Sequence, residues 1–412
     1  MIVDTPAAVT AAVPARRGGV LLMLVLLSGA PAMAMMFTVL GPVLPGLMQH
    51  FAAWGDGALI AQLVMTTPSI GLVLGGAPNG WLVERFGGAA VLKGSLFVYG
   101  LAGAAGLLLD GLPAFLVTRF VVGFTASGIA TAALALVGEH FHDDARSRVL
   151  SYQTAAGAAT GLVSLLLAGA VGQAWGWRWV FCLYLAAWPV LACAWWVLPR
   201  RRPDSVRRAT APALDGRFGL AGLGSLWHLY LLIIVVFIAV FMNAVQMSFL
   251  MAAEGITGPA VQSWVLAVGS IGNILGALSY GWLQRRLPGR RVFAFALTLM
   301  GVWLLLMGAV EGVTAKVVGS ALSAAGAGAV GPYVAMLLLD RAAPAVRGRA
   351  AGLLYSATFI GDFLNPLAVT PLRLGFGIHG AFMGIGAACL AGAALALLIA
   401  GAGRPHDGIR RR

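Results

Sequence analysis

Long apolar runs separated by short polar connections dominate this sequence. A membrane-spanning helix needs about 20 mostly apolar residues, and twelve runs meet that requirement within the 412 residues. They lie near residues 19–47, 58–83, 89–109, 114–138, 149–172, 179–198, 228–250, 260–284, 291–310, 316–339, 349–372 and 377–401. The pattern predicts an all-α integral membrane protein with twelve transmembrane helices.

One connection is longer than the others. The stretch at 199–226 is basic and contains Pro203 and Pro212, which is typical of a linker. We therefore expect an N-terminal six-helix bundle at 1–198, a cytoplasmic basic linker at 199–226 and a C-terminal six-helix bundle at 227–412.

The two predicted bundles share an internal repeat. The stretch from Gly80 to Gly87, Gly-Trp-Leu-Val-Glu-Arg-Phe-Gly, returns 201 residues later as Gly-Trp-Leu-Gln-Arg-Arg-Leu-Pro-Gly, from Gly281 to Gly289. The same offset pairs Glu139 with Asp340, Arg146 with Arg347 and Arg148 with Arg349. Matches at one fixed offset indicate a duplication, so the bundles should be pseudo-symmetric.

Composition and charge agree with the membrane assignment. The chain is 60% hydrophobic and 10% charged, whereas soluble domains carry about 25% charged residues. A net charge of +13 could suggest nucleic acid. However, 23 of the 27 Lys and Arg fall on the side of the termini and three on the other side. This positive-inside pattern places both termini in the cytoplasm, makes the lipid bilayer the partner and excludes nucleic acid.

The N-terminus resembles a signal peptide, because Arg16 and Arg17 precede an apolar run. That run continues to about Met48, which is long enough to span the bilayer. We therefore expect a retained first helix.

The repeated stretch resembles the loop signature of the major facilitator superfamily, Gly-x-Leu-x-Asp-Arg-x-Gly-Arg-Lys. Four positions match, Glu84 replaces the Asp, and Gly88-Ala89 replace the basic pair. The resemblance covers essentially the whole chain and implies two six-helix bundles. It also implies that signature loops control the conformational change of the protein. These loops comprise Gly80, Glu84, Arg85, Gly87, Glu139, Arg146, Arg286, Asp340 and Arg347.

Two further motifs bear on the direction of transport. Arg119 to Ser127 resembles the family's helix-4 motif, with Val122 in place of the usual Gln. The helix-5 antiporter motif, Gly-Pro-x-x-Gly-Gly, is replaced by Ser-Leu-Leu-Leu-Ala-Gly from Ser164 to Gly169. The missing Pro weakens the case for a drug–proton antiporter.

Two charged side chains, Asp362 and Arg119, lie deep within the predicted helices. A charge in a helix centre costs about 2.5–3.5 kcal/mol on insertion scales, so each is a functional candidate. Asp362 could exchange a proton in a coupling site, or local hydrogen bonds to Tyr355, Thr358 or Asn365 could fix it. Arg119 could serve coupling or contact the substrate, or it could bind the backbone of helix 1.

By resemblance, helices 1, 4, 7 and 10 line the transport pathway, and helices 2, 5, 8 and 11 lie at the interface between the halves. The substrate-lining candidates are Met33, Phe37, Asn243, Gln246, Tyr355 and Asn365. Flexible Met and aromatic side chains suit apolar ligands of variable shape. Such residues also occur on lipid-facing surfaces and in helix cores.

The run from Glu139 to Asp144 contains His and acidic residues. It has no second ligand set nearby, so we expect no metal site. The sequence contains no Walker-type phosphate loop, and we expect no cofactor.

These features predict a monomeric secondary active transporter of the bacterial inner membrane that works by alternating access. The expected task is proton-coupled efflux of a small amphipathic organic compound or drug, by antiport. The alternative is uptake or facilitated transport of a metabolite. A membrane-embedded sensor or enzyme is a remote alternative, and we expect no enzyme activity.

Overall fold

The structure is a computed structural model that describes residues 17–141, 143–198, 226–287, 289–342 and 347–402. Except for Leu226, the predicted linker at 199–226 lies outside the described residues.

The first half of the chain folds into helices joined by short turns. Its elements are α1 (Arg17–Leu27), α2 (Gly29–Thr38), η1 (Gly41–Val43), α3 (Leu44–Phe51), η2 (Ala52–Trp54), α4 (Gly57–Phe86), α5 (Gly88–Ala104), η3 (Ala105–Leu107), α6 (Leu112–His140), α7 (Asp143–Trp175), η4 (Trp177–Ala186) and α8 (Ala187–Val197). Asp56 caps the N-terminus of α4, because its Oδ1 accepts the backbone N–H groups of Ala58 and Leu59 at 3.1 and 3.2 Å.

The second half repeats this arrangement. Its helices are α9 (Trp227–Val240), α10 (Met242–Ala253), α11 (Pro259–Arg286), α12 (Arg290–Ala309), α13 (Val313–Arg341) and α14 (Arg347–Ala402). Gly377 interrupts α14 with φ 71° and ψ 175°, a conformation that glycine adopts without a steric penalty. The described chain has 11 helical segments long and apolar enough to cross a membrane, and the break divides the longest, Leu353–Ile399, into two. The result is the predicted twelve-helix architecture.

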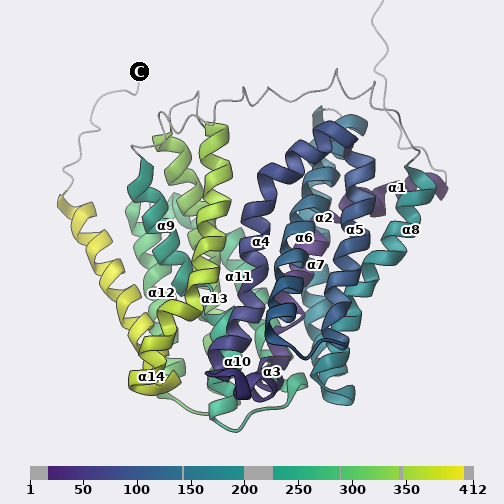
Figure 1. The fold of residues 1–412 in the computed structure, drawn as a ribbon. Coiled ribbons are helices and arrows are strands. Elements are labelled where there is room, and N and C mark those ends of the chain that lie inside the picture. Colours follow the sequence, from purple (N-terminus) through teal and green to yellow (C-terminus); the bar gives the residue numbers. More distant parts are fainter. Residues whose placement is uncertain (1–16, 142, 199–225, 288, 343–346, 403–412) are drawn as a thin grey trace, which may run out of the picture.

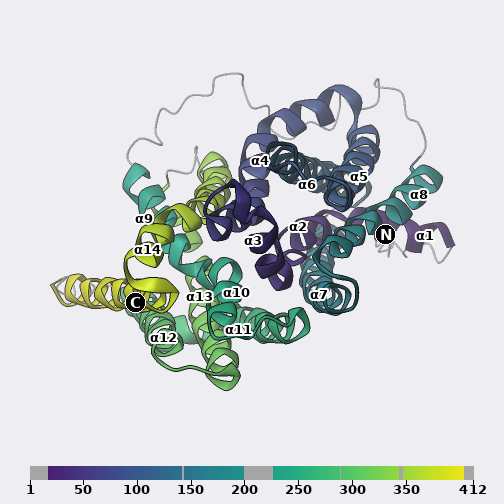
Figure 2. The same cartoon turned by 60° about the horizontal axis from the view of Figure 1, so that its bottom comes forward.

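The helices form two bundles that lie side by side (Figure 1). One contains α1 to α8 and the other α9 to α14, and the view in Figure 2 shows that α3 and α10 meet between them. Small residues allow close helix packing within each bundle. A Cβ on Gly123 of α6 would lie 1.8 Å from the carbonyl oxygen of Pro68 on α4, and one on Gly276 would lie 1.9 Å from that of Ala325 on α13.

The first and seventh membrane crossings are broken helices. The predicted helix at 19–47 is interrupted at Ser28 and again at Gly41–Val43, where a 3-10 turn contains Pro42. Proline lacks the N–H group that a continuous helix requires. The seventh crossing is interrupted at Phe241, between α9 and α10. Gly41 and Met242 are 201 residues apart, so the breaks occupy equivalent positions in the internal repeat.

The two halves touch toward one face of the membrane. We call the face at which α4, α6, α11 and α13 end the basic face, because Arg85, Arg286 and Arg341 lie there, and we call the other the opposite face. The described hydrogen bonds between the halves lie between the bundle centre and the opposite face. Nearer the basic face, Tyr355 is 66% exposed. Among the described residues, the hydrogen bonds between the halves therefore hold them together toward the opposite face, and none of these bonds lies near the basic face.

Candidate functional site

An ion pair joins the two halves at the opposite face. The Arg373 guanidinium of α14 donates to Asp56 Oδ2, at the start of α4. Burial of the Asp56 carboxyl acts to raise its pKa. Hydrogen bonds from the Leu59 backbone and from Arg373, together with the charge of Arg373, outweigh burial and hold the pKa below its ordinary value. The pair therefore joins two charged groups across the interface.

A cluster of buried amides lies deeper in the interface. Gln62 on α4 is six residues from Asp56, which is about 9 Å along the helix. Its Nε2 donates to Gln246 Oε1 of α10 at 2.8 Å, and Gln246 Nε2 donates to Asn365 Oδ1 of α14 at 2.8 Å. All three side chains are fully buried. Because the chain of hydrogen bonds crosses the interface, separating the halves exposes or re-pairs these amides.

Both helix breaks are contacted by polar side chains. Asn365 Nδ2 donates to the carbonyl oxygen of Ile238, just before the break at Phe241, at 2.7 Å. Ser248 Oγ donates to the carbonyl oxygen of Gly41, in the other half, at 2.7 Å. A broken helix leaves backbone groups without intrahelical partners. Such groups at corresponding positions of two repeats are typical of transporter binding sites.

Asp362 lies at the inner end of the interface contacts. The residue is 2% exposed, and its Oδ2 accepts a hydrogen bond from Ser69 Oγ of α4, in the other half. Ser69 is thirteen residues from Asp56, about 20 Å along α4 and near the middle of the membrane. No basic side chain forms an ion pair with Asp362 in the described part of the chain. The partner of this carboxyl is therefore a hydroxyl that could stay bound to either protonation state.

Two phenylalanines stack across the interface. Phe37 of α2 and Phe359 of α14 have ring centroids 5.3 Å apart and planes within 7° of parallel. Both side chains are partly exposed, in contrast to the buried amides. Phe359 is three residues from Asp362, so the pair and the carboxyl occupy neighbouring turns of α14.

The other predicted pathway residues are more dispersed. Met33 is partly buried on α2, one helical turn from Phe37. Asn243 Nδ2 donates to Ser323 Oγ within the second bundle at 2.8 Å. Tyr355 lies on α14 toward the basic face and is exposed. Of the six predicted lining residues, Phe37, Gln246 and Asn365 thus take part in or adjoin the contacts between the halves.

Arg119 lies away from this cluster, inside the first bundle. Its guanidinium donates to the carbonyl oxygens of Ala102 and Gly103 at 2.9 and 3.0 Å, at the C-terminal end of α5. It also lies 4.9 Å from the ring centroid of Phe181 and 5.3 Å from that of Tyr184. The carbonyl groups at a helix C-terminus stabilise a nearby cation. Here they belong to α5, which is the third membrane crossing.

The second bundle also has a buried cation on the end of a helix. Lys316 of α13 donates to the carbonyl oxygens of Met307 and Val310, at the end of α12, at 2.7 Å each. Here an acid is added, because Lys316 Nζ lies 2.5 Å from Oε1 of the buried Glu254. Each bundle therefore has a buried cation on the end of its third crossing, although Arg119 and Lys316 are not related by the offset of 201 residues.

Sequence reasoning missed the two ion pairs. Asp56 and Arg373 have opposite charges, and each lies near the opposite face on a helix that was expected at the interface. This combination is the signal that could have indicated their pairing. Glu254 and Lys316 are far apart in sequence and carry no motif.

The signature loops lie at the basic face. Gly87 ends α4 with φ 84°, which explains the glycine at that position. Arg85 lies 5.3 Å from the ring centroid of Trp81, and Arg286 lies 5.2 Å from that of Trp282. Among the described residues, Glu84 and Glu139 form no ion pair. The side chains of Arg146 and Arg347 are outside the described residues, as is that of His142 in the predicted His-containing loop.

Comparison with known proteins agrees with this architecture. The family model for the Major Facilitator Superfamily matches residues 26–258 and 229–411. The chain is similar to the 4-hydroxybenzoate transporter PcaK of Pseudomonas putida, with 25% identity over 328 residues, 69% of each chain. It is also similar to the gallate transporter of Pseudomonas putida, with 24% identity over 312 residues, 66% of this chain and 67% of that protein. Several other curated relatives match over only 25–33% of their own length.

A solved structure establishes the same fold independently. The D-xylose-proton symporter superposes with a TM-score of 0.74 at 15% identity, over 92% of this chain and 97% of that chain. The relatives are transporters, which excludes the enzyme alternative. With two six-helix bundles, broken first and seventh helices and a family model that spans both halves, this chain is an integral membrane transport protein that belongs to the major facilitator superfamily.

Proposed function

We propose that this protein is a proton-coupled secondary transporter that works by alternating access, with Asp362 as the group that carries the proton. The observation that carries the proposal is the bond between Asp362 and Ser69, which joins the two halves at mid-membrane. A charged carboxylate in this position is costly unless it is solvated or paired. Protonation removes that cost, so proton binding can shift the equilibrium between the state closed at one membrane face and the state closed at the other.

The proposed substrate is a small aromatic carboxylic acid. 4-Hydroxybenzoate and gallate, which are named for two relatives, share a planar ring and a carboxylate. Phe37 and Phe359 offer ring faces beside Asp362, and the amides of Gln62 and Gln246 offer N–H donors when the halves separate. Aromatic rings favour offset stacking on one another.

The direction of transport has two candidates. The sequence predicts efflux in exchange for protons. Relatives named as carriers of 4-hydroxybenzoate and gallate favour the second candidate, which is transport of the acid together with a proton. By the positive-inside rule the basic face is the cytoplasmic one, and we place the protein in a bacterial inner membrane.

The test uses proteoliposomes with a pH-sensitive dye inside and radiolabelled 4-hydroxybenzoate or gallate outside. An imposed pH gradient should drive substrate movement, and the sign of the dye signal separates symport from antiport. Asp362→Asn should lose gradient-driven accumulation yet retain exchange of labelled for unlabelled substrate, which needs no net proton movement. Asp110→Asn is the matched control, because Asp110 is an exposed carboxyl outside the interface.

Two results would overturn the proposal. Gradient-driven accumulation by Asp362→Asn at the wild-type level removes Asp362 from coupling. Substrate movement by the wild type without any proton signal makes the protein a uniporter or couples it to another ion.

A further inference from the structure

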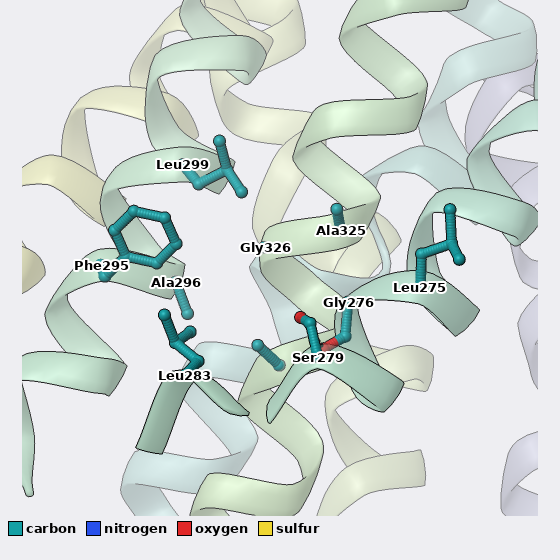
Figure 3. Close-up of a pocket in the computed structure, with 10 residues that line it drawn as sticks. Leu275, Gly276, Ser279, Leu283, Phe295, Ala296, Leu299, Ala325 and Gly326 are labelled. Atoms are coloured by element: carbon teal, nitrogen blue, oxygen red, sulfur yellow. Dashed lines mark hydrogen bonds between the residues drawn. The ribbon is translucent and has the colours of Figure 1, made fainter. Parts of the chain in front are cut away.

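The second bundle has an apolar crevice that the transport pathway does not use. It lies where α11 and α12 both pack on α13 while scarcely touching one another (Figure 3). The crevice has a volume of about 230 Å³, several times the roughly 30 Å³ share of one water molecule in the liquid. It is open on one side, and two residues on its walls, Leu275 and Phe295, are 59% and 46% exposed.

Small residues create this space. A Cβ on Gly276 of α11 would lie 1.9 Å from the carbonyl oxygen of Ala325, and one on Gly326 of α13 would lie 2.6 Å from that of Ala296 on α12. These close approaches draw α11 and α12 onto α13, and Figure 3 shows Ala325 and Gly326 between the flanking side chains. The backbone contacts thus form a floor, and the larger Leu and Phe side chains form the walls.

The chemistry of the crevice suits a hydrocarbon chain. Its walls are apolar except for Ser279, whose Oγ already donates to the carbonyl oxygen of Gly276 at 2.9 Å. A polar ligand would therefore find no unpaired side-chain group there, and it would lose its own hydrogen bonds.

A basic cluster lies just beyond the end of the crevice. Arg285 and Arg286 end α11, and Arg290 and Arg291 begin α12. Leu283, which lines the crevice, is only three residues from Arg286, about 4.5 Å along the helix. All four arginines are exposed, and none takes part in the ion pairs among the described residues. Arg290 also donates to the carbonyl oxygen of Ile399 at 3.2 Å, which directs it toward α14.

The internal repeat shows that this basic character belongs to the second half. The equivalent of Arg285 in the first half is Glu84, at the offset of 201 residues. The first copy therefore has an acid, Glu84, beside Arg85, whereas the second copy has two arginines, Arg285 and Arg286, at the equivalent positions. Arginine pairs well with phosphate through its several N–H donors.

We propose that this crevice and the arginines at its mouth bind one anionic phospholipid from the leaflet at the basic face. An acyl chain lies in the crevice, and the phosphate contacts Arg285 and Arg286. Trp282 is 55% exposed beside Arg286 and lies at the depth where tryptophan favours the lipid headgroup region. The site is separate from the interface between the halves.

The test measures lipid binding to the delipidated full-length protein by native mass spectrometry. Dioleoyl phosphatidylglycerol and dioleoyl phosphatidylcholine are compared, because their acyl chains are identical. The wild type should bind the first phosphatidylglycerol at least about tenfold more strongly than phosphatidylcholine. Arg285→Gln combined with Arg286→Gln should weaken this binding by about fivefold per arginine removed.

Two controls separate the site from general charge and from the headgroup alone. Arg85→Gln combined with Arg148→Gln removes the same charge from the basic face and should leave binding within about twofold. Ser279→Trp fills the crevice and should weaken phosphatidylglycerol binding while the basic cluster stays intact. Leu275→Trp gives a second filling variant if Ser279→Trp is not monodisperse.

Several outcomes would overturn the proposal. These are equal binding of the two lipids, equal losses in the two double variants, and unchanged binding in both filling variants. Complete displacement of the lipid by millimolar glycerol phosphate would show that a free phosphate, not a lipid, is the ligand. Failure of any of these tests leaves the proposed transport function untouched.

Discussion

The ion pair between Asp56 and Arg373 should hold the transporter closed at the opposite face. Arg373→Gln removes the charge from α14. Asp56→Asn removes the partner charge but retains the helix cap, because asparagine is as good an N-cap as aspartate. The two changes therefore isolate the charge interaction from the folding of α4.

The expected magnitude follows from the partial burial of the pair. The Arg373 and Asp56 side chains are 17% and 30% exposed. A fully exposed pair contributes about 0.2–1 kcal/mol, and breaking a fully buried one costs about 3–5 kcal/mol. We take about 1 kcal/mol, which corresponds to a roughly fivefold rise in the ratio of the open to the closed state at this face.

The assay measures the distance between the halves by pulsed electron paramagnetic resonance. Spin labels replace Leu108 and Phe376, which are 86% and 75% exposed near the opposite face of the first and second half. Cys182, Cys193 and Cys389 are changed to alanine beforehand. Each single variant should shift population toward the longer distance, and the double variant should add little to either.

The double variant decides the outcome. Because the interaction exists only when both charges are present, a real pair gives strongly non-additive effects. Additive shifts, or no shift in either single variant, would refute the assignment of this pair as a closing contact.

Three further predictions concern pH and stability. Since the pKa of Asp56 lies below its ordinary value, the stabilising charge interaction is fully present above about pH 4 and is lost as the pH falls further. Between pH 8 and 5, titration of this pair should therefore leave the measured distance distribution unchanged. Glu254→Gln leaves the fully buried Lys316 without its acid and should cost about 3–5 kcal/mol of stability, which should lower the apparent melting temperature in detergent. Adding Lys316→Met should restore much of the loss. An unchanged melting temperature in the single variant would contradict the role of the pair. Gly123→Ala places a methyl group against the backbone of α4 and should lower the apparent melting temperature in detergent. Gly76→Ala should not, because a Cβ at Gly76 has no neighbour within 4 Å. Equal melting temperatures of the two variants would refute the packing argument.

The sequence determined the architecture because the bilayer imposes a strong one-dimensional rule. Every backbone group in the hydrocarbon core needs a partner, so a long apolar run becomes a helix. The twelve predicted crossings follow from run length alone, and the offset of 201 residues made two equivalent bundles predictable. The breaks in the first and seventh helices were not predicted: Pro42 lies at the first, and the matching break at Phe241 contains no proline.

The tertiary structure decided which polar residues meet. Asp362 was predictable as a candidate from its depth, but its partner Ser69 lies 293 residues away, on a helix of the other half. Arg119 has the same sequence signature, a charge within an apolar run, and yet it packs on the end of α5 among aromatic rings. Asp56 and Arg373 lie in predicted connections, and their opposite charges form a pair because the fold places these two segments together.

The physical reason is that burial in a membrane is a local property, whereas pairing is not. Apolar run length and charge asymmetry depend on neighbours in the chain, and they set the number and direction of crossings. Which helix face points to the interface depends on helix rotation and packing, and these follow from small residues in contact with distant backbone. The sequence therefore determines that this protein spans the membrane in two repeated bundles, and only the packing of those bundles determines where its polar side chains converge.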